Sequence, residues 1–287
     1  MREFDLRALQ NCELDVLNEF IRVCNKYNLK YYAAWGTMLG AVRHQGFIPW
    51  DDDIDVCMPY DDYIRFKEVC KTELGAGYFY EDWHAHHDYF LHWAKIRKNN
   101  TTCMTRSEAD LKIHWGVGID IFPLIKLDKP RLGFDKKFAK VFLNLILQRA
   151  YYHHGAENIS KKVKRVLYTM IPRIWDEKII NICFRIMSKA KIDAAYVYEF
   201  SEPISRACNL QEVYGEGKMY QFEDIMINGP EDSDAFLRTA YGDDYMIVPD
   251  EEKRIDHGDI IVDVNTNYTY YQIQEGFEDA DFVFTES

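Results

Sequence analysis

Residues 35–56 read WGTMLGAVRHQGFIPWDDDIDV, a glycine-containing turn followed by a run of aspartates, and this stretch decides the fold. Because the side chains of an extended strand alternate between two faces, we expect Asp51, Asp53 and Asp55 to project from one face. Three carboxylates on one face repel each other, which costs stability unless a cation neutralises them. Mg²⁺ and Mn²⁺ are hard divalent cations that prefer such oxygen ligands. The pattern therefore predicts a metal site, with Asp52, on the opposite face, in a structural role.

A helix is expected between the turn and the aspartates. Residues 31–35 are short and aromatic, as in a strand, and Thr37 is a suitable N-cap for a helix that ends near Gly46. The free N–H groups and the dipole of a helix N-terminus favour a phosphate, which would lie at Gly36 and Thr37. A strand over residues 53–58 would then return the carboxylates to the same place. This order of elements predicts a diphosphate between the turn and the cation.

A second strand carries a further carboxylate. Residues 116–124 read GVGIDIFPL, in which the apolar residues alternate on one face and Asp120 lies on the other. A charge within an apolar strand is costly unless it is paired or bound to a metal. We therefore predict that Asp120 is the third carboxylate of the metal site, and an ion pair with a lysine or arginine is the alternative.

The composition is typical of a globular protein. The 287 residues are 47% hydrophobic and 29% charged, enough for one large domain or two modest ones. No apolar run approaches the ~18 residues of a membrane span, and the first residues do not begin a secretory signal, so we expect a cytoplasmic protein. Seven scattered cysteines without a C-x-x-C pair indicate reduced thiols rather than disulfides or a thiolate metal site.

The charge is unevenly distributed along the chain. The net charge of -12 argues against nucleic-acid binding, which depends on clustered lysines and arginines. Yet residues 129–191 hold 15 lysines and arginines against 4 acidic residues, a net of +11, whereas the remainder holds 20 against 43, a net of -23. The basic segment also has apolar residues at helical spacing, as do residues 5–29. A basic amphipathic helix can lie on an anionic membrane or meet a partner, and packing on the core with a solvated basic face is the alternative.

Three blocks of the sequence together form a recognisable pattern: residues 36–56, residues 118–124 and a C-terminal block of Tyr241, Gly242, Asp243, Asp244, Tyr245, Met246, Pro249, Glu251, Glu252, Lys253, Arg254 and His257. These blocks resemble the LicD family of phosphocholine transferases, whose relatives include fukutin-related protein. The resemblance implies an α+β fold of the nucleotidyltransferase (polymerase-β-like) type, a small mixed sheet flanked by helices. Residues 1–128 would form the catalytic core, residues 129–192 a basic helical insertion, and residues 193–287 the part that completes the catalytic domain.

The resemblance also implies a reaction. Enzymes of this family move a phosphoalcohol from a cytidine diphosphate carrier to a sugar hydroxyl. The expected donor is a CDP-alcohol, with CDP-choline favoured, and the expected acceptor is a cell-surface glycan or its lipid-linked precursor, such as lipopolysaccharide or teichoic acid. Asp53, Asp55 and Asp120 would be catalytic and hold Mg²⁺ or Mn²⁺, with Asp51 as an auxiliary ligand and Asp120 able to take the proton of the attacking hydroxyl. Residues 129–192 carry none of the family's motifs, and it is their basic, amphipathic pattern that leads us to expect them to hold the enzyme peripherally at the inner membrane face.

Donor binding is assigned to backbone N–H groups and to basic side chains. The candidates are Gly36, Thr37, Arg43, His44, Lys95, Arg97, Arg254 and His257. Glycine suits close contact with a phosphate because it has no Cβ. Helix capping is the alternative for Arg43 and His44, and an exposed strand edge is the alternative for Lys95 and Arg97. Arg254 and His257 rest on the family resemblance alone.

Other features leave alternatives open. A quaternary ammonium needs an aromatic cage, for which Trp35, Trp50 and Trp93 are nearest in sequence, although core packing also explains them. A cluster of four histidines has no cysteine pair nearby to complete a zinc site, which makes zinc a minor alternative; these are His84, His86, His87 and His92. Transfer of a nucleotide itself is a second possible reaction, and a non-catalytic scaffold that binds glycan or lipid is a third reading.

Overall fold

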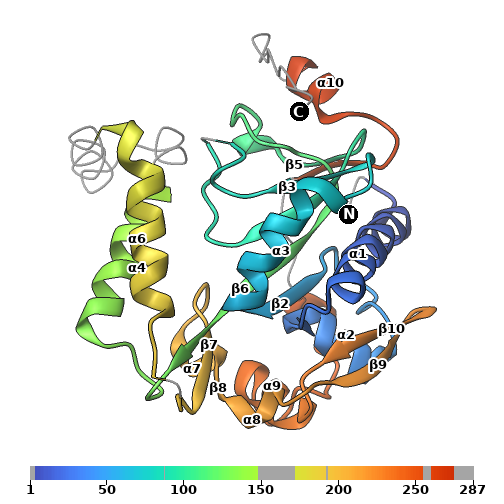
Figure 1. Ribbon diagram of the computed structural model, residues 1–287. Coiled ribbons are helices and arrows are strands. Elements are labelled where there is room, and N and C mark those ends of the chain that lie inside the picture. Colours follow the sequence, from blue (N-terminus) through green and yellow to red (C-terminus); the bar gives the residue numbers. More distant parts are fainter. Residues whose placement is uncertain (1–3, 87, 148–171, 192, 255–259, 275–287) are drawn as a thin grey trace.

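A mixed sheet of seven strands forms the centre of the part of the chain that the computed structural model describes, residues 4–86, 88–147, 172–191, 193–254 and 260–274 (Figure 1). Five strands lie in the order β1-β2-β6-β4-β3, while β7 pairs with β6 and β8 pairs with β7. Their bounds are β1 Tyr32–Ala33, β2 Asp55–Pro59, β3 Tyr78–Glu81, β4 Ala94–Lys98, β6 Gly118–Leu127, β7 Tyr196–Glu199 and β8 Cys208–Leu210.

Strand β6 is central because three strands pair with it. β2 runs parallel to it and places Asp55 beside Asp120. On its other side, β4 is antiparallel along the first half of β6, with Lys95 opposite Asp120, and β7 is antiparallel along the second half. Because direct partners in a sheet point to the same face, Asp55, Asp120 and Lys95 share one face.

Two long helices pack on the apolar side of this sheet. Helix α1 (Leu6–Tyr27) begins where the Asp5 carboxylate accepts two backbone hydrogen bonds from the first turn, and it ends at Asn28 in the left-handed conformation. It packs with α3 (Tyr60–Glu73) against β6. The residues that alternate with the charged ones belong to the same core cluster as the inner faces of both helices, which includes Phe20, Phe66, Val56, Ile119 and Ile121.

Helix α2 (Trp35–His44) follows β1 directly and already includes Gly36 and Thr37. The prediction of a turn at these two residues is therefore wrong. The N-cap is Ala34, not Thr37, and Trp35 begins the helix with φ at 41°. Positive φ is rare for a bulky residue, and strain of this kind persists only where the surrounding packing enforces it. Thr37 lies in the first helical turn instead, where its hydroxyl accepts a hydrogen bond from the backbone N–H of Asp55 (2.8 Å). This bond ties α2 to the first residue of β2.

The start of β2 also differs from the expectation. The sequence predicts a strand over residues 53–58, but the strand begins at Asp55. Asp51 and Asp53 therefore lie in the segment before the strand, and strand alternation does not set the direction of their side chains.

Smaller elements surround the sheet (Figure 1). At the β1 end, α9 packs on α2, and the hairpin of β9 and β10 contacts α2 and β1. A second pair of strands, β5 and β11, lies near α10, and α4 packs along α6. The bounds are β5 Thr102–Thr105, η1 Arg106–Glu108, α4 Phe134–Leu147, η3 Arg173–Trp175, α6 Asp176–Ser188, α7 Ile204–Ala207, α8 Gln211–Tyr214, β9 Lys218–Phe222, β10 Ile225–Gly229, α9 Ser233–Tyr241, η4 Glu251–Lys253, β11 Ile260–Asp263 and α10 Tyr268–Gln274.

The α+β class and the mixed sheet flanked by helices are confirmed. The helix expected over residues 5–29 is α1, and the basic segment contains α4 and α6, while its residues 148–171 and 192 lie outside the described residues. All seven cysteines are free, as expected. Among the helices that the structure describes, none has the length and apolar character needed to cross a membrane.

A buried ion pair fixes β4 to β3. Arg97 and Glu81 are 5% and 0% exposed, and the Arg97 Nε donates to Glu81 at 3.1 Å. Arg97 Nη1 also donates to the Gly116 carbonyl (3.0 Å), and Glu81 accepts from the His114 N–H (2.6 Å) and pairs with His86 (2.8 Å). Burial acts to raise the pKa of Glu81, but the hydrogen bond to His86 and the charge of Arg97 outweigh it and lower the pKa.

We predict that Arg97→Met destabilises the protein by about 3–5 kcal/mol, because it leaves the Glu81 carboxylate buried without its cation. Urea unfolding followed by circular dichroism measures the change. The matched control is Arg65→Met, which breaks an exposed pair with Asp62 (2.8 Å) and should cost at most about 1 kcal/mol. Equal losses in the two variants would contradict the prediction.

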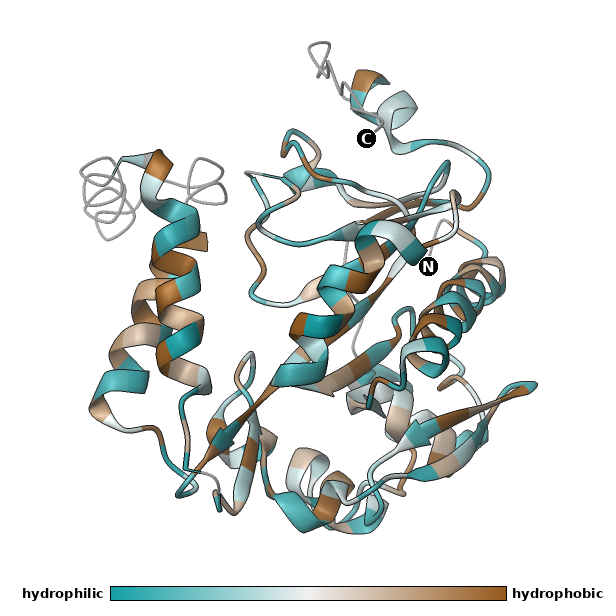
Figure 2. Ribbon diagram, in the orientation of Figure 1, coloured by the Kyte–Doolittle hydropathy of each residue, from teal (hydrophilic) through white to brown (hydrophobic). Residues whose placement is uncertain are grey.

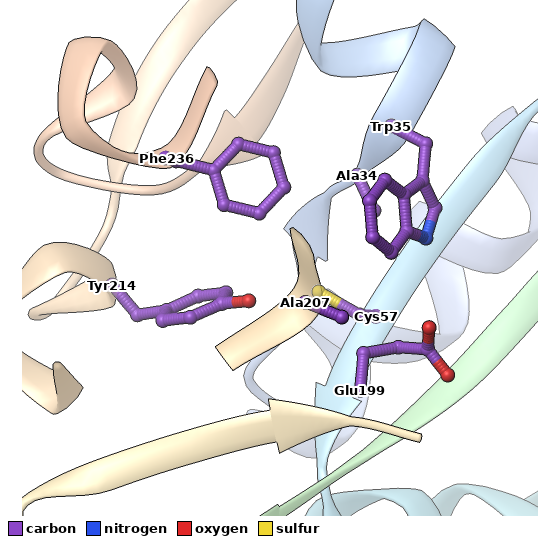
Figure 3. A pocket seen from close by; sticks show the side chains of 7 residues that line it. All are labelled: Ala34, Trp35, Cys57, Glu199, Ala207, Tyr214 and Phe236. Carbon is purple, nitrogen blue, oxygen red and sulfur yellow. The ribbon is translucent and has the colours of Figure 1, made fainter. Parts of the chain in front are cut away.

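A narrow recess lies between α2, β2 and the helices of the C-terminal part (Figure 3). It is too narrow to hold a water molecule, and its lining includes the ring of Trp35 and the carboxylate of Glu199. The Glu199 carboxylate accepts hydrogen bonds from the N–H (2.7 Å) and the hydroxyl (2.5 Å) of Ser201. Burial nevertheless raises the pKa of Glu199 to about 7. The other residues that line the recess are Ala34, Cys57, Ala207, Tyr214 and Phe236.

We predict that Glu199→Gln stabilises the protein at alkaline pH. A folded-state pKa near 7, above the ordinary 4.5, means that stability is full at low pH and is lost as Glu199 ionises with rising pH. The variant should match the wild type near pH 4.5 and exceed it by up to about 3 kcal/mol at pH 8, at about 1.4 kcal/mol per pKa unit. Chemical denaturation across this pH range tests it, with the exposed Glu212→Gln as the control for loss of a surface carboxylate. A constant difference at all pH values would contradict the prediction.

Candidate active site

The site is built on a row of charged side chains, Asp55, Asp120 and Lys95, that crosses β2, β6 and β4 and that we call the acidic row. Asp55 and Asp120 are neighbours in the β2–β6 register, and Lys95 on β4 forms an ion pair with Asp120. The lysine pairing considered as the alternative for Asp120 is therefore present, and so is the convergence of Asp120 with Asp55. The two outcomes are compatible because Asp120 lies between the other two residues.

The carboxylates are crowded. Burial, followed by the negative charges of Asp53 and Asp120, raises the pKa of Asp55 well above its usual range, and Asp51 adds to this effect. The positive charge of Lys95 opposes it. The fold thus brings together all four aspartates that the sequence assigned to the metal site.

The Asp51 carboxylate lies beside the first turn of α2, where the sequence predicted a bound phosphate. A Cβ on Gly36 would lie 2.5 Å from an oxygen of the Asp51 carboxylate, so a larger residue here would require the Asp51 side chain to move. Asp51 therefore lies at the helix end where a phosphate was expected, and an anion is favourable there. Thr37 is buried and positions Asp55 through its hydroxyl.

The acidic side chains do not form a complete metal cage by themselves. Among the residues that the structure describes, no group of three histidines, cysteines, aspartates or glutamates is arranged to hold a metal ion. Mg²⁺ commonly uses one or two carboxylates together with phosphate oxygens of the substrate. The crowding at Asp55 fits that mode of binding, since a cation there would relieve repulsion that Lys95 leaves uncompensated.

A basic and aromatic cluster lies beside the acidic row. Arg43 at the end of α2 donates to His44 (3.0 Å) and to the carbonyl of Tyr245 (2.9 Å). The His44 ring contacts Trp50 edge to face, and the Arg254 guanidinium lies 4.1 Å from the centre of the Trp50 ring. Burial lowers the pKa of both Arg43 and His44. The C-terminal block of the sequence thus meets the N-terminal motif here, although about two hundred residues separate them.

Of the remaining residues predicted to bind the donor, one lies at the site and another is engaged elsewhere in the fold. Lys95 lies in the acidic row, whereas the Arg97 side chain is engaged inside the fold by Glu81 and Gly116. His257 lies outside the described residues. Of the histidines considered for zinc, His84 and His86 contact different carboxylates, Asp82 and Glu81, and His92 stacks on Phe200; His87 is outside the described residues.

Sequence reasoning missed the role of one aromatic residue at the site. Tyr241, the last residue of α9, belongs to the C-terminal block but received no role. Burial of its hydroxyl, followed by the charges of Asp55, Asp51 and Asp53, raises its pKa, so the field of these carboxylates reaches Tyr241. The residue as a whole is 37% exposed. No local pattern marks such a residue, because only the packing of α9 on α2 brings it there.

We predict that Asp55→Asn raises the melting temperature of the protein in EDTA at pH 8. A raised folded-state pKa means that ionised Asp55 destabilises the fold above its ordinary pKa of 3.8, by about 1.4 kcal/mol for each unit by which the pKa is raised. The amide has nearly the same size and no charge, so it removes that repulsion. Differential scanning fluorimetry measures the effect.

The matched control is Asp82→Asn, another buried aspartate. Burial acts to raise the pKa of Asp82, but a hydrogen bond from His84 and the charge of Lys67 (2.9 Å) outweigh it and lower the pKa. That carboxylate stabilises the fold, so its loss should lower the melting temperature. If both variants change the melting temperature in the same direction, the assignment of Asp55 as a repelled carboxylate fails.

Part of the chain is similar to a known protein family and to individual proteins. Residues 28–137 match the family described as LicD/FKTN/FKRP, nucleotidyltransferase domain. Over 78 residues the chain is 45% identical to the lipopolysaccharide cholinephosphotransferase LicD of Haemophilus influenzae, covering 27% of this chain and 29% of that protein. Over 53 residues, 18% of this chain, it is 47% identical to an uncharacterized protein of Rickettsia typhi and 45% identical to one of Rickettsia prowazekii, covering 17% and 20% of these proteins.

The chain thus aligns with less than a third of the length of each of these relatives. The matched region contains Gly36, the aspartates before and in β2, and Asp120, which the fold brings close together. The resemblance seen in the sequence is therefore confirmed over residues 28–137, which are similar to the nucleotidyltransferase domain of the LicD family.

Proposed function

We propose that this protein transfers a phosphoalcohol, with phosphocholine favoured, from a CDP-alcohol donor to a sugar hydroxyl of a cell-surface glycan or its lipid-linked precursor. The observation that carries the proposal is the acidic row of Asp55 and Asp120 inside a region matched to the LicD family. The relative named as a lipopolysaccharide cholinephosphotransferase supports both the transferred group and the class of acceptor. A polymerase-β-like arrangement of the sheet is part of the same proposal.

Each side chain has a role that its position favours. Asp53 and Asp55 would hold Mg²⁺ or Mn²⁺, which when bound neutralises charge on the diphosphate and on the leaving CMP. Asp120, held in place by Lys95, would accept the proton of the attacking hydroxyl. The hydroxyl attacks the phosphorus that bears the alcohol, and the bond from this phosphorus to the oxygen of CMP breaks.

Two neighbouring groups would orient the donor. Lys95 and the exposed edge of the basic cluster at Arg43 and Arg254 offer positive charge to the two phosphates. Asp51 would stay at the N-terminus of α2, behind the reacting groups, rather than bind the metal directly. Alignment of the two substrates is the main requirement, because phosphoryl transfer depends chiefly on position and charge.

Nucleotide transfer is the second candidate, favoured by the name of the matched family, a nucleotidyltransferase domain. With CDP-choline the two reactions differ in the bond that is broken. Phosphocholine transfer releases CMP, whereas CMP transfer releases free phosphocholine and leaves CMP on the acceptor. Chromatography of the products separates them.

We expect release of CMP from CDP-choline that depends on Mg²⁺ or Mn²⁺ and on a glycan acceptor, and that Asp53→Asn lowers its rate by about a hundredfold or more. The reason is that loss of one ligand charge removes cation binding at the diphosphate. The matched control is Asp61→Asn, an exposed residue of α3 that should leave the rate unchanged.

Thermal shift with CDP-choline, CDP-ethanolamine, CDP-glycerol and CDP-ribitol, each with Mg²⁺, identifies the donor, because a ligand at ~100 times its dissociation constant stabilises by about 2.7 kcal/mol. Full activity in the folded Asp53→Asn variant would remove these carboxylates from the reaction. No stabilisation by any CDP-alcohol would refute the donor class.

A further inference from the structure

The helical hairpin of α4 and α6 carries a second apolar surface, which is exposed to solvent in the part of the chain that the structure describes. Its inner surface is accounted for by a separate core cluster, in which both helices pack on each other and on β6 and β7. Members of this cluster include Ala139, Leu143, Ile180, Phe184 and Tyr198. The hairpin lies at one side of the molecule, away from α1 and the β9–β10 hairpin (Figure 1).

The outer surface of α4 is apolar and solvent-exposed. Phe134, Phe138 and Val141 are 87%, 62% and 64% exposed, and their spacing of four and three residues places them on one side of the helix. The partner elements continue the pattern, with Ile174, Trp175 and Ile182 at 86%, 58% and 48%. Figure 2 shows hydrophobic and hydrophilic residues alternating along both helices. We call these six residues the outer apolar stripe.

Exposed cations accompany the stripe. Residues 129–147 and 172–191 hold ten lysines and arginines against three acidic residues, whereas the chain outside 129–191 has a net charge of -23. Exposed members on or beside the two helices are Lys129, Arg131, Lys137, Lys178, Arg185, Lys189 and Lys191. The same two helices of an otherwise acidic protein therefore carry both the exposed cations and the exposed aromatic and aliphatic side chains.

We propose that the outer apolar stripe and its cations dock the protein peripherally on an anionic lipid surface. Interfacial helices combine aromatic and aliphatic residues, which enter the headgroup region, with lysines and arginines, which bind anionic headgroups. Tryptophan and tyrosine are favoured at this interface, and Trp175 is such a residue.

The charge of the hairpin also favours an anionic lipid surface, rather than a second copy of the chain, as the partner of the stripe. Two copies facing each other through the stripe would bring two basic surfaces together, which is unfavourable. An anionic bilayer attracts the hairpin and repels the acidic remainder, so the same charge distribution fixes the orientation of the protein on the surface. This inference does not depend on the proposed transfer reaction, because lipid binding is measured without substrates.

The test is co-sedimentation of the full chain with vesicles of phosphatidylcholine alone or mixed with phosphatidylglycerol, at low and high salt. The wild type should bind the mixed vesicles and be partly released by salt. The double variant Lys137→Glu with Arg185→Glu should lower the partition coefficient about tenfold or more. The double variant Phe138→Ser with Val141→Ser should lower it as well.

Matched controls make substitutions of the same kind, cation to glutamate and apolar residue to serine, elsewhere on the surface. Lys112→Glu with Lys218→Glu changes the same number of exposed cations outside the hairpin, and Met219→Ser with Met226→Ser removes exposed apolar side chains from β9 and β10. Both should bind within about twofold of the wild type. Circular dichroism verifies that each variant is folded.

Three results would overturn the proposal. The first is equal binding of the wild type to neutral and anionic vesicles, or binding to neither. The second is an equal loss of binding in the control variants. The third is a dimer in sedimentation velocity that disappears in the Phe138→Ser, Val141→Ser variant, which would assign the stripe to a second copy of the chain.

Discussion

The parallel register of β2 and β6 is the constraint on which the site depends, because it forces Asp55 and Asp120 to lie side by side. A register displaced by one residue would turn one carboxylate toward the apolar core under α1 and α3. The observed register keeps Ile119 and Ile121 of β6 in that core and both carboxylates on the opposite face. Packing of the apolar face therefore determines the geometry of the charged face.

The carboxylates that the proposed function needs also lower the stability of the folded protein. The pKa of Asp55 is raised by burial and by neighbouring carboxylates, so the site as it stands is electrostatically unfavourable. Lys95 compensates on one side through Asp120, and the Thr37 hydroxyl holds the backbone at Asp55. Such conflict between local stability and arrangement is expected where a ligand is to supply the missing charge.

Local sequence patterns predicted many of the strands, helices and site residues. The contacts between them depend on long-range pairing, which local patterns do not contain. Alternation in residues 116–124 was enough to place Asp120 on the face opposite Ile119, because the period of a strand is two. No pattern could show that Lys95 would be its partner, since the β4–β6 register depends on the whole sheet. Thr37 suits a helix N-cap by residue type, yet tertiary contact with β2 moved the start of α2 to Trp35. The C-terminal block shows the same limit, because Arg254 contacts Trp50 and Tyr241 reaches the acidic row only when the chain folds back onto α2.

The charge of the site also bears on the order in which substrates would bind. A free diphosphate is an anion and would approach a face that already carries several carboxylates, with Lys95 engaged by Asp120. Neighbouring like charges repel, and the repulsion is stronger in a partly buried site than in water. A cation bound to the diphosphate reverses the sign of the interaction and adds ligands that the protein lacks. The donor would therefore enter as its metal complex, and the acidic row would discriminate against the free nucleotide.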